Sequence, residues 1–424
     1  MDKLPLTSKD ILAEKIARMR EEFPEVFSEG KIDFERLKMA LGEFVDNNRE
    51  RYGLTWAGKS EAIRNIQTPS VGTLLPVPEE SVNFETSENL IIEGDNLEVL
   101  KLLQKSYHGK IKMIYIDPPY NTGNEFIYPD NFREGLEDYL RYSGQVDGDG
   151  IKLSTNTETD GRFHSKWLNM MYPRLYLARN LLREDGVIFV SIDDNEVRNL
   201  RALMDEIYGE ENFVANIIWE KKFSPQNDER YITSAHDHIL LYARNKSNWR
   251  PFLLPRTDEA NERFKNPDND PRGPWSSGDM TSKTKAKGHS YPITSPSGKV
   301  FLPPSGRQWA PSEETFQRWL AEGRIWFGEN GDRVPRIKQY ASEIQQGIVP
   351  MSIWKHTEVG HNQEAKQEFN AWFKDNPVEF DTPKPKRLIK RMLQIACGDD
   401  DIVLDFFAGS GTTAEAVLDR NIEG

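Results

Sequence analysis

The stretch IKMIYIDPPY, residues 111–120, decides the fold of this chain. Its first six residues form an apolar, β-rich run, which predicts a buried parallel strand, and an aspartate with two prolines ends that strand abruptly. In open α/β sheets, ligands bind at the C-terminal ends of the strands. We therefore expect a binding site at DPPY, residues 117–120.

The residue types of this turn suit a planar base that carries an exocyclic amino group. The Asp117 carboxylate and the Pro118 carbonyl can accept the two N–H bonds of such a group, and Pro119 stiffens the backbone beside them. The ring of Tyr120 can stack on the face of the base. An ordinary Asp-Pro turn with a surface tyrosine has the same four letters, so this motif by itself leaves both interpretations open.

A second strand followed by a glycine turn lies near the C-terminal end of the sequence. Residues 402–407 (IVLDFF) predict another buried strand, residues 408–413 (AGSGTT) a turn, and residues 414–418 a helix. Strand, glycine turn and helix is the arrangement with which doubly wound folds bind cofactors, since glycines let the backbone approach a ligand and the helix start favours an anion. No lysine follows the glycines, so the turn is not a P-loop.

Together, the two segments resemble the S-adenosylmethionine-dependent amino-methyltransferases of DNA, in the beta group whose catalytic motif precedes the cofactor loop. Four segments further resemble the modification subunits of type III restriction–modification systems: residues 51–59 (RYGLTWAGK), 92–100 (IEGDNLEVL), 116–123 (IDPPYNTG) and 382–385 (TPKP). The resemblance implies methylation of adenine N6 in DNA, at a short non-palindromic site, with S-adenosyl-L-methionine as cofactor.

The resemblance also implies a domain order. We expect an α/β fold with a doubly wound, Rossmann-like methyltransferase sheet, a helical N-terminal region and an inserted mixed α+β target recognition domain. The expected bounds are 1–80 for the helical region and linker, 81–245 for the catalytic half, 246–365 for the target recognition domain and 366–424 for the cofactor-loop half. Buried-type residues in the insert, among them Trp309, Phe316 and Phe327, indicate that it is folded.

Periodicity places further elements around the two motifs. Expected strands are 90–92, 187–192, 213–219 and 238–242, the last two as antiparallel neighbours, and expected helices are 11–23, 34–45, 97–105, 166–182 and 384–395. Pro173 should kink its helix or mark the true start, and Gly186 should cap that helix.

The implied chemistry follows from the weak nucleophilicity of the adenine amino nitrogen. Hydrogen bonds to Asp117 and the Pro118 carbonyl would push that nitrogen toward a tetrahedral geometry, and most of the rate would come from in-line positioning. The base must leave the duplex, with Tyr120 as its stacking partner. No metal is needed for this step, and no Cys or His cluster has metal-ligand spacing.

The resemblance assigns cofactor contacts to nine residues: Asp95, Asn96, Lys384, Asp405, Phe406, Gly409, Ser410, Gly411 and Thr412. Asp405 is placed to meet the ammonium group of the methionine part, and Lys384 its carboxylate. Alternatives remain for several of them: Asp95 and Asn96 could cap a helix, Thr412 and Thr413 could do the same, and Lys384 could be a solvated lysine.

Charge and cysteine content set limits on location and partners. The single cysteine, Cys397, excludes an intramolecular disulfide and suits a reducing cytoplasm, and the sequence has no membrane-spanning run. The net charge is −13, yet residues 281–312 contain no Asp or Glu. We expect DNA contacts from this basic and aromatic segment, or else a solvated basic loop. The candidates are Lys283, Lys285, Lys287, Tyr291, Lys299 and Arg307.

The expected partners are double-stranded DNA, a second copy of the chain and a helicase–nuclease restriction subunit. The family's cofactor fold continues past the glycine loop, whereas this sequence stops at Gly424, so we expect a truncated chain. Cytosine-N4 methylation and a DNA-recognition module without activity are the alternatives. A nicotinamide-dependent oxidoreductase would leave residues 117–120 unexplained.

Overall fold

A computed structural model describes residues 10–28, 30–41, 53–122, 160–224, 231–256, 261–284, 287–343, 347–374 and 380–423. The chain divides into two units, the first made of Met1–Phe252 with Met351–Gly424 and the second of Leu253–Pro350. The second unit starts and ends within the bounds expected for the target recognition domain. No helix in the described part of the chain is long and apolar enough to cross a membrane.

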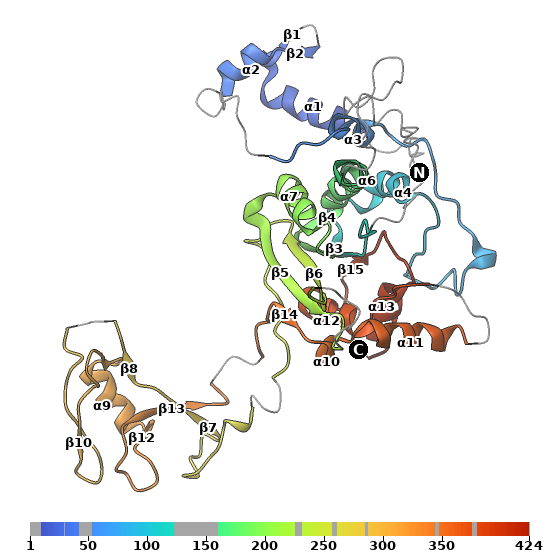
Figure 1. Ribbon diagram of the computed structural model, residues 1–424. Helices are drawn as coiled ribbons and strands as arrows, with labels where there is room; N and C mark the ends of the chain where they lie inside the picture. The colour runs from blue at the N-terminus through green and yellow to red at the C-terminus, as the bar shows by residue number, and fades with distance from the viewer. Residues whose placement is uncertain are drawn as a thin grey trace. The chain divides into compact units, whose positions relative to one another are not determined.

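A six-stranded sheet organises the first unit (Figure 1). The strands follow the order β14 (Ile353–Trp354), β5 (Phe213–Glu220), β6 (His236–Ala243), β4 (Leu182–Ile192), β3 (Ile111–Ile116) and β15 (Ile402–Leu404). Parallel pairing joins β3 to both β4 and β15, while β6 runs antiparallel to β4 and β5. The C-terminal ends of β15, β3 and β4 therefore meet the start of β6 at one edge of the sheet.

Three helices cover one face of this sheet, as Figure 1 shows. They are α4 (Asn96–Tyr107), α6 (Asp160–Leu181) and α7 (Val197–Tyr208). Alternate residues of β3 and β4, such as Ile114 and Ile188, join leucines of these helices in one buried cluster. The strand β3 is buried along its whole length, because helices and neighbouring strands enclose it.

The remaining elements of this unit include α12 (Lys386–Ala396), which contacts β3 and α13 (Thr412–Glu423). Near the N-terminus lie α1 (Ile11–Glu22), η1 (Pro24–Val26), β1 (Phe27–Ser28), β2 (Lys31–Ile32), α2 (Phe34–Leu41), α3 (Lys59–Gln67) and η3 (Pro78–Glu80). Further along are η4 (Glu210–Asn212), α10 (His356–Val359) and α11 (Asn362–Trp372). The expected continuation of α2 to residue 45 lies outside the described residues.

The strands expected at 111–116, 187–192, 213–219 and 238–242 are confirmed, including the antiparallel pairing of the last two. Four expectations are wrong. The buried strand expected at 402–407 ends at Leu404, and its first residue, Ile402, is 41% exposed. Residues 90–92 form no strand, and Ile91 is 94% exposed. The helix expected from 166 starts at Asp160 and passes through Pro173, so the proline does not mark its start. Gly186 lies inside β4, where a Cβ would stand 2.9 Å from the Ile111 carbonyl oxygen. This glycine serves close strand packing, not a helix cap.

The second unit is a small mixed α+β fold. Its three-stranded sheet has the order β12 (Ile325–Trp326), β13 (Arg336–Tyr340) and β7 (Trp275–Gly278). Two short pairs, β8 (Thr281–Ser282) with β11 (Gln308–Trp309) and β9 (Ile293–Thr294) with β10 (Val300–Phe301), accompany helix α9 (Glu313–Ala321). Trp309, Phe316 and Phe327 are buried together in its core, which confirms that the insert is folded.

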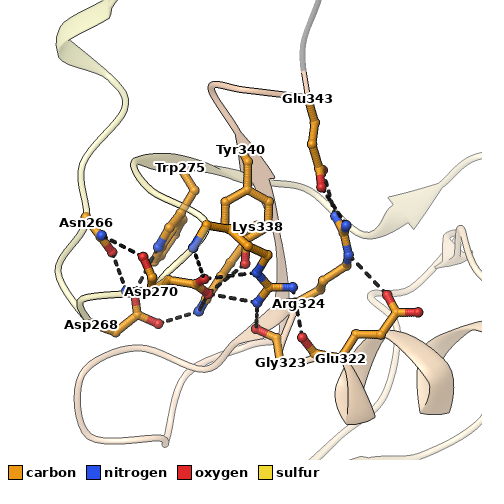
Figure 2. Close-up of polar contacts among 11 residues, drawn as sticks. Asn266, Asp268, Asp270, Trp275, Glu322, Gly323, Arg324, Lys338, Tyr340 and Glu343 are labelled. Atoms are coloured by element: carbon orange, nitrogen blue, oxygen red, sulfur yellow. Dashed lines mark hydrogen bonds and ion pairs between the residues drawn. The ribbon is translucent and has the colours of Figure 1, made fainter.

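A buried ion network ties the second unit together (Figure 2). Asp270 accepts hydrogen bonds from Lys338 Nζ at 2.8 Å, from the Tyr340 hydroxyl at 2.7 Å and from two Arg272 nitrogens at 2.9 and 2.8 Å. These donors, Arg272 first, hold the pKa of Asp270 well below its usual range. A buried carboxylate with this many donors is fully compensated, and removal of the carboxylate would take away the charge that Arg272 and Lys338 share.

Candidate active site

The Asp117 carboxylate stands at the end of β3, with one oxygen engaged and the other open. Its Oδ2 accepts a hydrogen bond from Lys384 Nζ at 2.5 Å, so the residues before α12 meet the end of β3. Its Oδ1 is buried and has no hydrogen-bond partner in the described part of the chain. A buried carboxylate oxygen without a donor is costly, so this atom is poised for a donor from a ligand.

Tyr120 is held in place from two sides. Its hydroxyl donates to Asp237 Oδ2 at 3.4 Å, and Lys384 Nζ lies 5.0 Å from the centre of its ring. Burial and the neighbouring Asp117 carboxylate raise the pKa of the Tyr120 hydroxyl well above its usual range. The tyrosine therefore stays neutral and offers an aromatic ring beside the Asp117 carboxylate.

The backbone of the DPPY turn is fixed by two contacts to the helical layer. Trp167 of α6 donates its ring N–H to the Pro119 carbonyl at 2.7 Å. Asn121, in the left-handed region at φ +55°, donates to Glu196 Oε1 at 2.6 Å. These two hydrogen bonds fix the path of the backbone after the prolines. The turn is therefore rigid, as a precise binding site requires.

Glu196 is a fully buried acid that the sequence analysis did not single out. Besides Asn121, its carboxylate contacts His164 Nδ1 at 2.6 Å and accepts a hydrogen bond from Asn199 at 2.8 Å. No short sequence pattern marks this residue, because the partners of Glu196 come from α6, α7 and the turn after β3.

A second buried pair, Lys221 with Asp237, was also missed. Asp237 is 3% exposed and binds Lys221 Nζ at 2.6 Å through its Oδ1, while its other oxygen accepts from Tyr120. Burial raises the pKa of Asp237, and Lys221 opposes that rise. The only signal in the sequence is a charged residue one position before the apolar run HILLYA, residues 238–243.

The glycine turn follows β15 and is organised around Asp405. This carboxylate accepts the Phe407 N–H at 2.9 Å and the Thr413 hydroxyl at 2.6 Å. Burial raises the pKa of Asp405 to about 6, the Asp117 carboxylate adding to the effect. Gly409 and Gly411 have φ of +54° and +78°, which favour glycine at both positions.

A cavity of about 310 Å³ lies beside this turn. Lys384, Ser410, Gly411 and Thr412 line one part of it, and aromatic residues of α11 such as Phe369 line another. Ser410 and Thr412 exchange a hydrogen bond of 2.9 Å between their hydroxyls. The described structure thus brings Lys384 next to both the Asp117 carboxylate and the glycine turn.

The helix-cap alternative is confirmed for Asp95, which accepts the Glu98 N–H at 3.0 Å at the start of α4. Asn96 instead links two elements. Its amide donates to the Phe406 carbonyl at 2.8 Å and accepts from Arg174 at 2.6 Å. Contact of either residue with a ligand stays a prediction.

The six candidate residues of the basic segment expected to bind DNA differ in their surroundings. Lys283, Lys287 and Lys299 are exposed, whereas Lys285 lies outside the described residues. Arg307 forms an ion pair of 3.0 Å with Asp279. Tyr291 is 6% exposed and donates its hydroxyl to the Pro311 carbonyl at 3.1 Å. The expectation for Tyr291 is wrong, because its apolar ring packs in the core of the second unit.

Comparison with known proteins decides what kind of protein carries this site. A family model described as DNA methylase, of the N6/N4 type, matches residues 111–423. The chain belongs to this family. The match begins with β3 and runs through the glycine turn and α13, so both halves of the candidate site lie within the DNA methylase segment.

Two curated relatives extend the similarity toward the N-terminus of this DNA methylase. The chain is 37% identical to the Mod subunit of the type III restriction-modification enzyme StyLTI of Salmonella typhimurium, over 94% of this chain and 61% of the relative. It is 32% identical to the EcoP15I Mod subunit of Escherichia coli, over 96% of this chain and 68% of the relative. A solved structure of the cytosine-N4-specific PvuII DNA methyltransferase aligns with 77% of each chain at 13% identity and a TM-score of 0.37.

Proposed function

We propose that this DNA methylase transfers a methyl group from S-adenosyl-L-methionine to N6 of a flipped-out adenine, as the modification subunit of a type III restriction–modification system. The observation that carries this function is the Asp117 carboxylate, which has Lys384 on one oxygen and a buried, open acceptor at the other. The similarity to two type III Mod subunits supports the choice of system.

The open Oδ1 of Asp117 accepts one N–H of the adenine amino group, and the Pro118 carbonyl accepts the other. Both hydrogen bonds withdraw the nitrogen lone pair from conjugation with the ring, because they favour a tetrahedral nitrogen. The Tyr120 ring stacks on the base and excludes water from one face. Lys384 keeps the engaged oxygen of Asp117 neutralised, so the carboxylate presents a single acceptor in a fixed direction.

The residues around the glycine turn fit the amino acid part of the cofactor. Such a group carries an ammonium and a carboxylate, and the turn offers the Asp405 carboxylate together with the Lys384 ammonium. Ser410 and Gly411 line the cavity without bulky side chains, and Gly409 precedes them in the turn. When bound, the cofactor supplies an activated methyl group on a sulfonium, and the residues of the chain orient and enclose it.

Asp237 and Lys221 act as positioning residues. The Tyr120 hydroxyl donates to Asp237, and Lys221 holds Asp237 in turn, so the pair fixes the plane of the stacking ring. A fixed ring matters because methyl transfer needs the nitrogen, the methyl carbon and the sulfur in line.

Partners and location follow from the same proposal. The substrate is double-stranded DNA, which the exposed lysines at positions 283, 287 and 299 contact through its phosphates. The chain works as a homodimer in the cytoplasm and pairs with a helicase–nuclease restriction subunit.

The test is transfer of labelled methyl from S-adenosyl-L-methionine to unmethylated plasmid DNA. The wild-type chain should transfer label, and Asp117→Ala should lower the rate by at least about 100-fold, as expected for loss of an essential transition-state contact. The matched control is Asp399→Ala, which removes the carboxylate of a fully exposed side chain and should transfer label like the wild type. Equal transfer by Asp117→Ala and the control would overturn the assignment.

A further inference from the structure

Two histidines of β6 and an aspartate from the segment after β4 meet at the start of β6, in the sheet of the first unit. His236 and His238 are two positions apart on β6, so their side chains stand on the same face. Asp194 follows the end of β4. One possible ligand atom from each of the three residues lies within 4.8 Å of those of the other two. Sequence spacing did not predict this group, because the aspartate comes from the segment after β4, far from the histidines in the sequence.

Strand pairing fixes the geometry of the group. Ile192, at the end of β4, pairs with His238, and Glu220, at the end of β5, pairs with His236. The two histidines therefore sit on a strand held from both sides. The His238 Nε2 atom lies 3.1 Å from Asp194 Oδ1, and the two imidazole rings have centres 5.1 Å apart.

Asn216 of β5 orients the His238 ring. It lies on the same face of the sheet, and its side-chain amide faces His238 Nδ1, with Nδ2 at 3.1 Å and Oδ1 at 3.3 Å. When the amide oxygen accepts a proton carried on Nδ1, the Nε2 lone pair is free to bind a metal ion on the side of Asp194. A partner on the second ring nitrogen is a regular feature of metal-ligating histidines, because it fixes both tautomer and ring direction.

A simple histidine–aspartate hydrogen bond would account for His238 and Asp194 but not for His236. Among the described residues, the His236 ring contacts the His238 ring and has no hydrogen-bond partner. The Asp194 side chain is 66% exposed, so the open side of the group faces solvent.

We propose that His236, His238 and Asp194 bind one divalent first-row transition metal ion, of the Zn²⁺ class. Imidazole is a ligand that Zn²⁺, Cu²⁺ and Ni²⁺ prefer, and a carboxylate completes a set of three protein donors. Solvent on the side of Asp194 leaves room for water in the remaining position. Mg²⁺ prefers oxygen ligands in octahedral geometry and should not compete for this site.

A metal ion bound at this position would affect the edge of the sheet. Asp237 lies between the two histidines and contacts Tyr120 on the opposite face of β6. A bound ion would cross-link β6 to the segment after β4, and so would stiffen the strand end that carries Asp237. The metal site does not depend on the proposed methyl transfer, and its test needs no DNA.

The test is calorimetric titration of the full chain, after treatment with a chelator, with ZnCl₂ and separately with MgCl₂. We expect one equivalent of Zn²⁺ per chain and no binding of Mg²⁺ at this site. His236→Gln and Asp194→Asn should each weaken Zn²⁺ binding more than tenfold, and Asn216→Leu about 10- to 100-fold, as is usual for the residues that orient a ligand. The control His108→Gln removes an exposed histidine from α4's C-terminal end and should bind like the wild type.

A second measurement separates loss of a ligand from loss of the fold. Zn²⁺ should raise the Tm of the wild type and of His108→Gln, because an ion that binds only the folded state stabilises it, and should leave the Tm of His236→Gln unchanged. Absence of one-equivalent binding would overturn the proposal. Wild-type affinity in His236→Gln and Asp194→Asn, or equal weakening in His108→Gln, would also overturn it, since binding would then come from scattered surface groups.

Discussion

The Nζ atom of Lys384 and the Oδ2 atom of Asp117 lie 2.5 Å apart, although 267 positions separate the two residues in the sequence. This ion pair joins the two halves of the DNA methylase segment. It also leaves the second oxygen of Asp117 as a buried acceptor, on which the proposed chemistry rests.

Removal of the lysine should weaken both the fold and the activity. Lys384→Met leaves the partly buried Asp117 carboxylate without its partner, which should lower the free energy of unfolding by about 1–3 kcal/mol. Methyl transfer should fall at least tenfold, since the carboxylate loses its orientation. Urea unfolding and the transfer assay measure the two effects. Lys384→Arg, which keeps the charge, should recover part of the activity, and wild-type values for Lys384→Met would contradict the role of the pair.

Cofactor affinity should depend on pH through Asp405. Burial raises the pKa of this carboxyl to about 6, so it is an anion above that pH and protonated below it. The ammonium group of S-adenosyl-L-methionine binds the anion, and affinity should therefore drop as pH falls from about 7 to 5. Calorimetry across this range measures the change. In Asp405→Asn the affinity should be low at every pH, and a wild-type pH dependence in that variant would exclude Asp405 as the anchor.

The Asp405 carboxyl should make the folded chain less stable as pH rises, whereas a salt-bridged aspartate makes it more stable. Its pKa is higher in the folded chain than the ordinary value of 3.8, so the folded state binds the proton more tightly than the unfolded state between about pH 4 and 6. The stability of the wild type relative to Asp405→Asn should fall by about 3 kcal/mol as pH rises through this window. Urea midpoints at several pH values measure it, and a constant difference would contradict the shift.

Loss of the Asp237 carboxylate should affect the chemical step more than cofactor binding. Asp237→Asn leaves Lys221 without its partner and loosens the contact to the Tyr120 hydroxyl. We expect kcat to fall about tenfold with little change in KM for S-adenosyl-L-methionine, because the ring positions the base and not the cofactor. Tyr120→Phe, which keeps the ring and loses the hydroxyl, should share part of this loss. A change confined to KM for the cofactor would count against a positioning role.

The buried network of the second unit should control its stability. Asp270→Asn takes the charge partner from Arg272 and leaves Lys338 with Asp268 alone, and should destabilise this unit by about 3 kcal/mol. Thermal unfolding followed by tryptophan fluorescence measures the effect, since Trp275 and Trp309 lie in this unit. Asp332→Asn, at an exposed position, is the matched control and should change the stability by less than about 0.5 kcal/mol.

The sequence allowed prediction of those parts of the site that one short segment determines. The apolar run before Asp117 had to be a buried strand, and the turn after Asp405 had to contain glycines, because each pattern depends on neighbours in sequence. Contacts that depend on strand register could not be predicted. Asp237 meets Tyr120, and His238 meets Asp194, only because β6 pairs with β4 and β5 in one particular register.

Errors in the sequence analysis have the same origin. Tyr291 stands in a basic, polar segment, but its ring is needed to fill the small core of the second unit. Gly186 follows a helical pattern and has the residue type of a cap, yet the close approach of β3 and β4 is what requires glycine there. In both cases a nonlocal contact determined the role of the residue.

The central claim is that the Asp117 carboxylate receives the amino group of adenine, and identification of the methylated base tests it most directly. Plasmid DNA incubated with the chain and S-adenosyl-L-methionine would be digested to nucleosides and separated by mass spectrometry. We predict N6-methyladenine in the reaction with the wild type and none with Asp117→Ala. N4-methylcytosine in place of N6-methyladenine, or N6-methyladenine formed equally by Asp117→Ala, would contradict the claim.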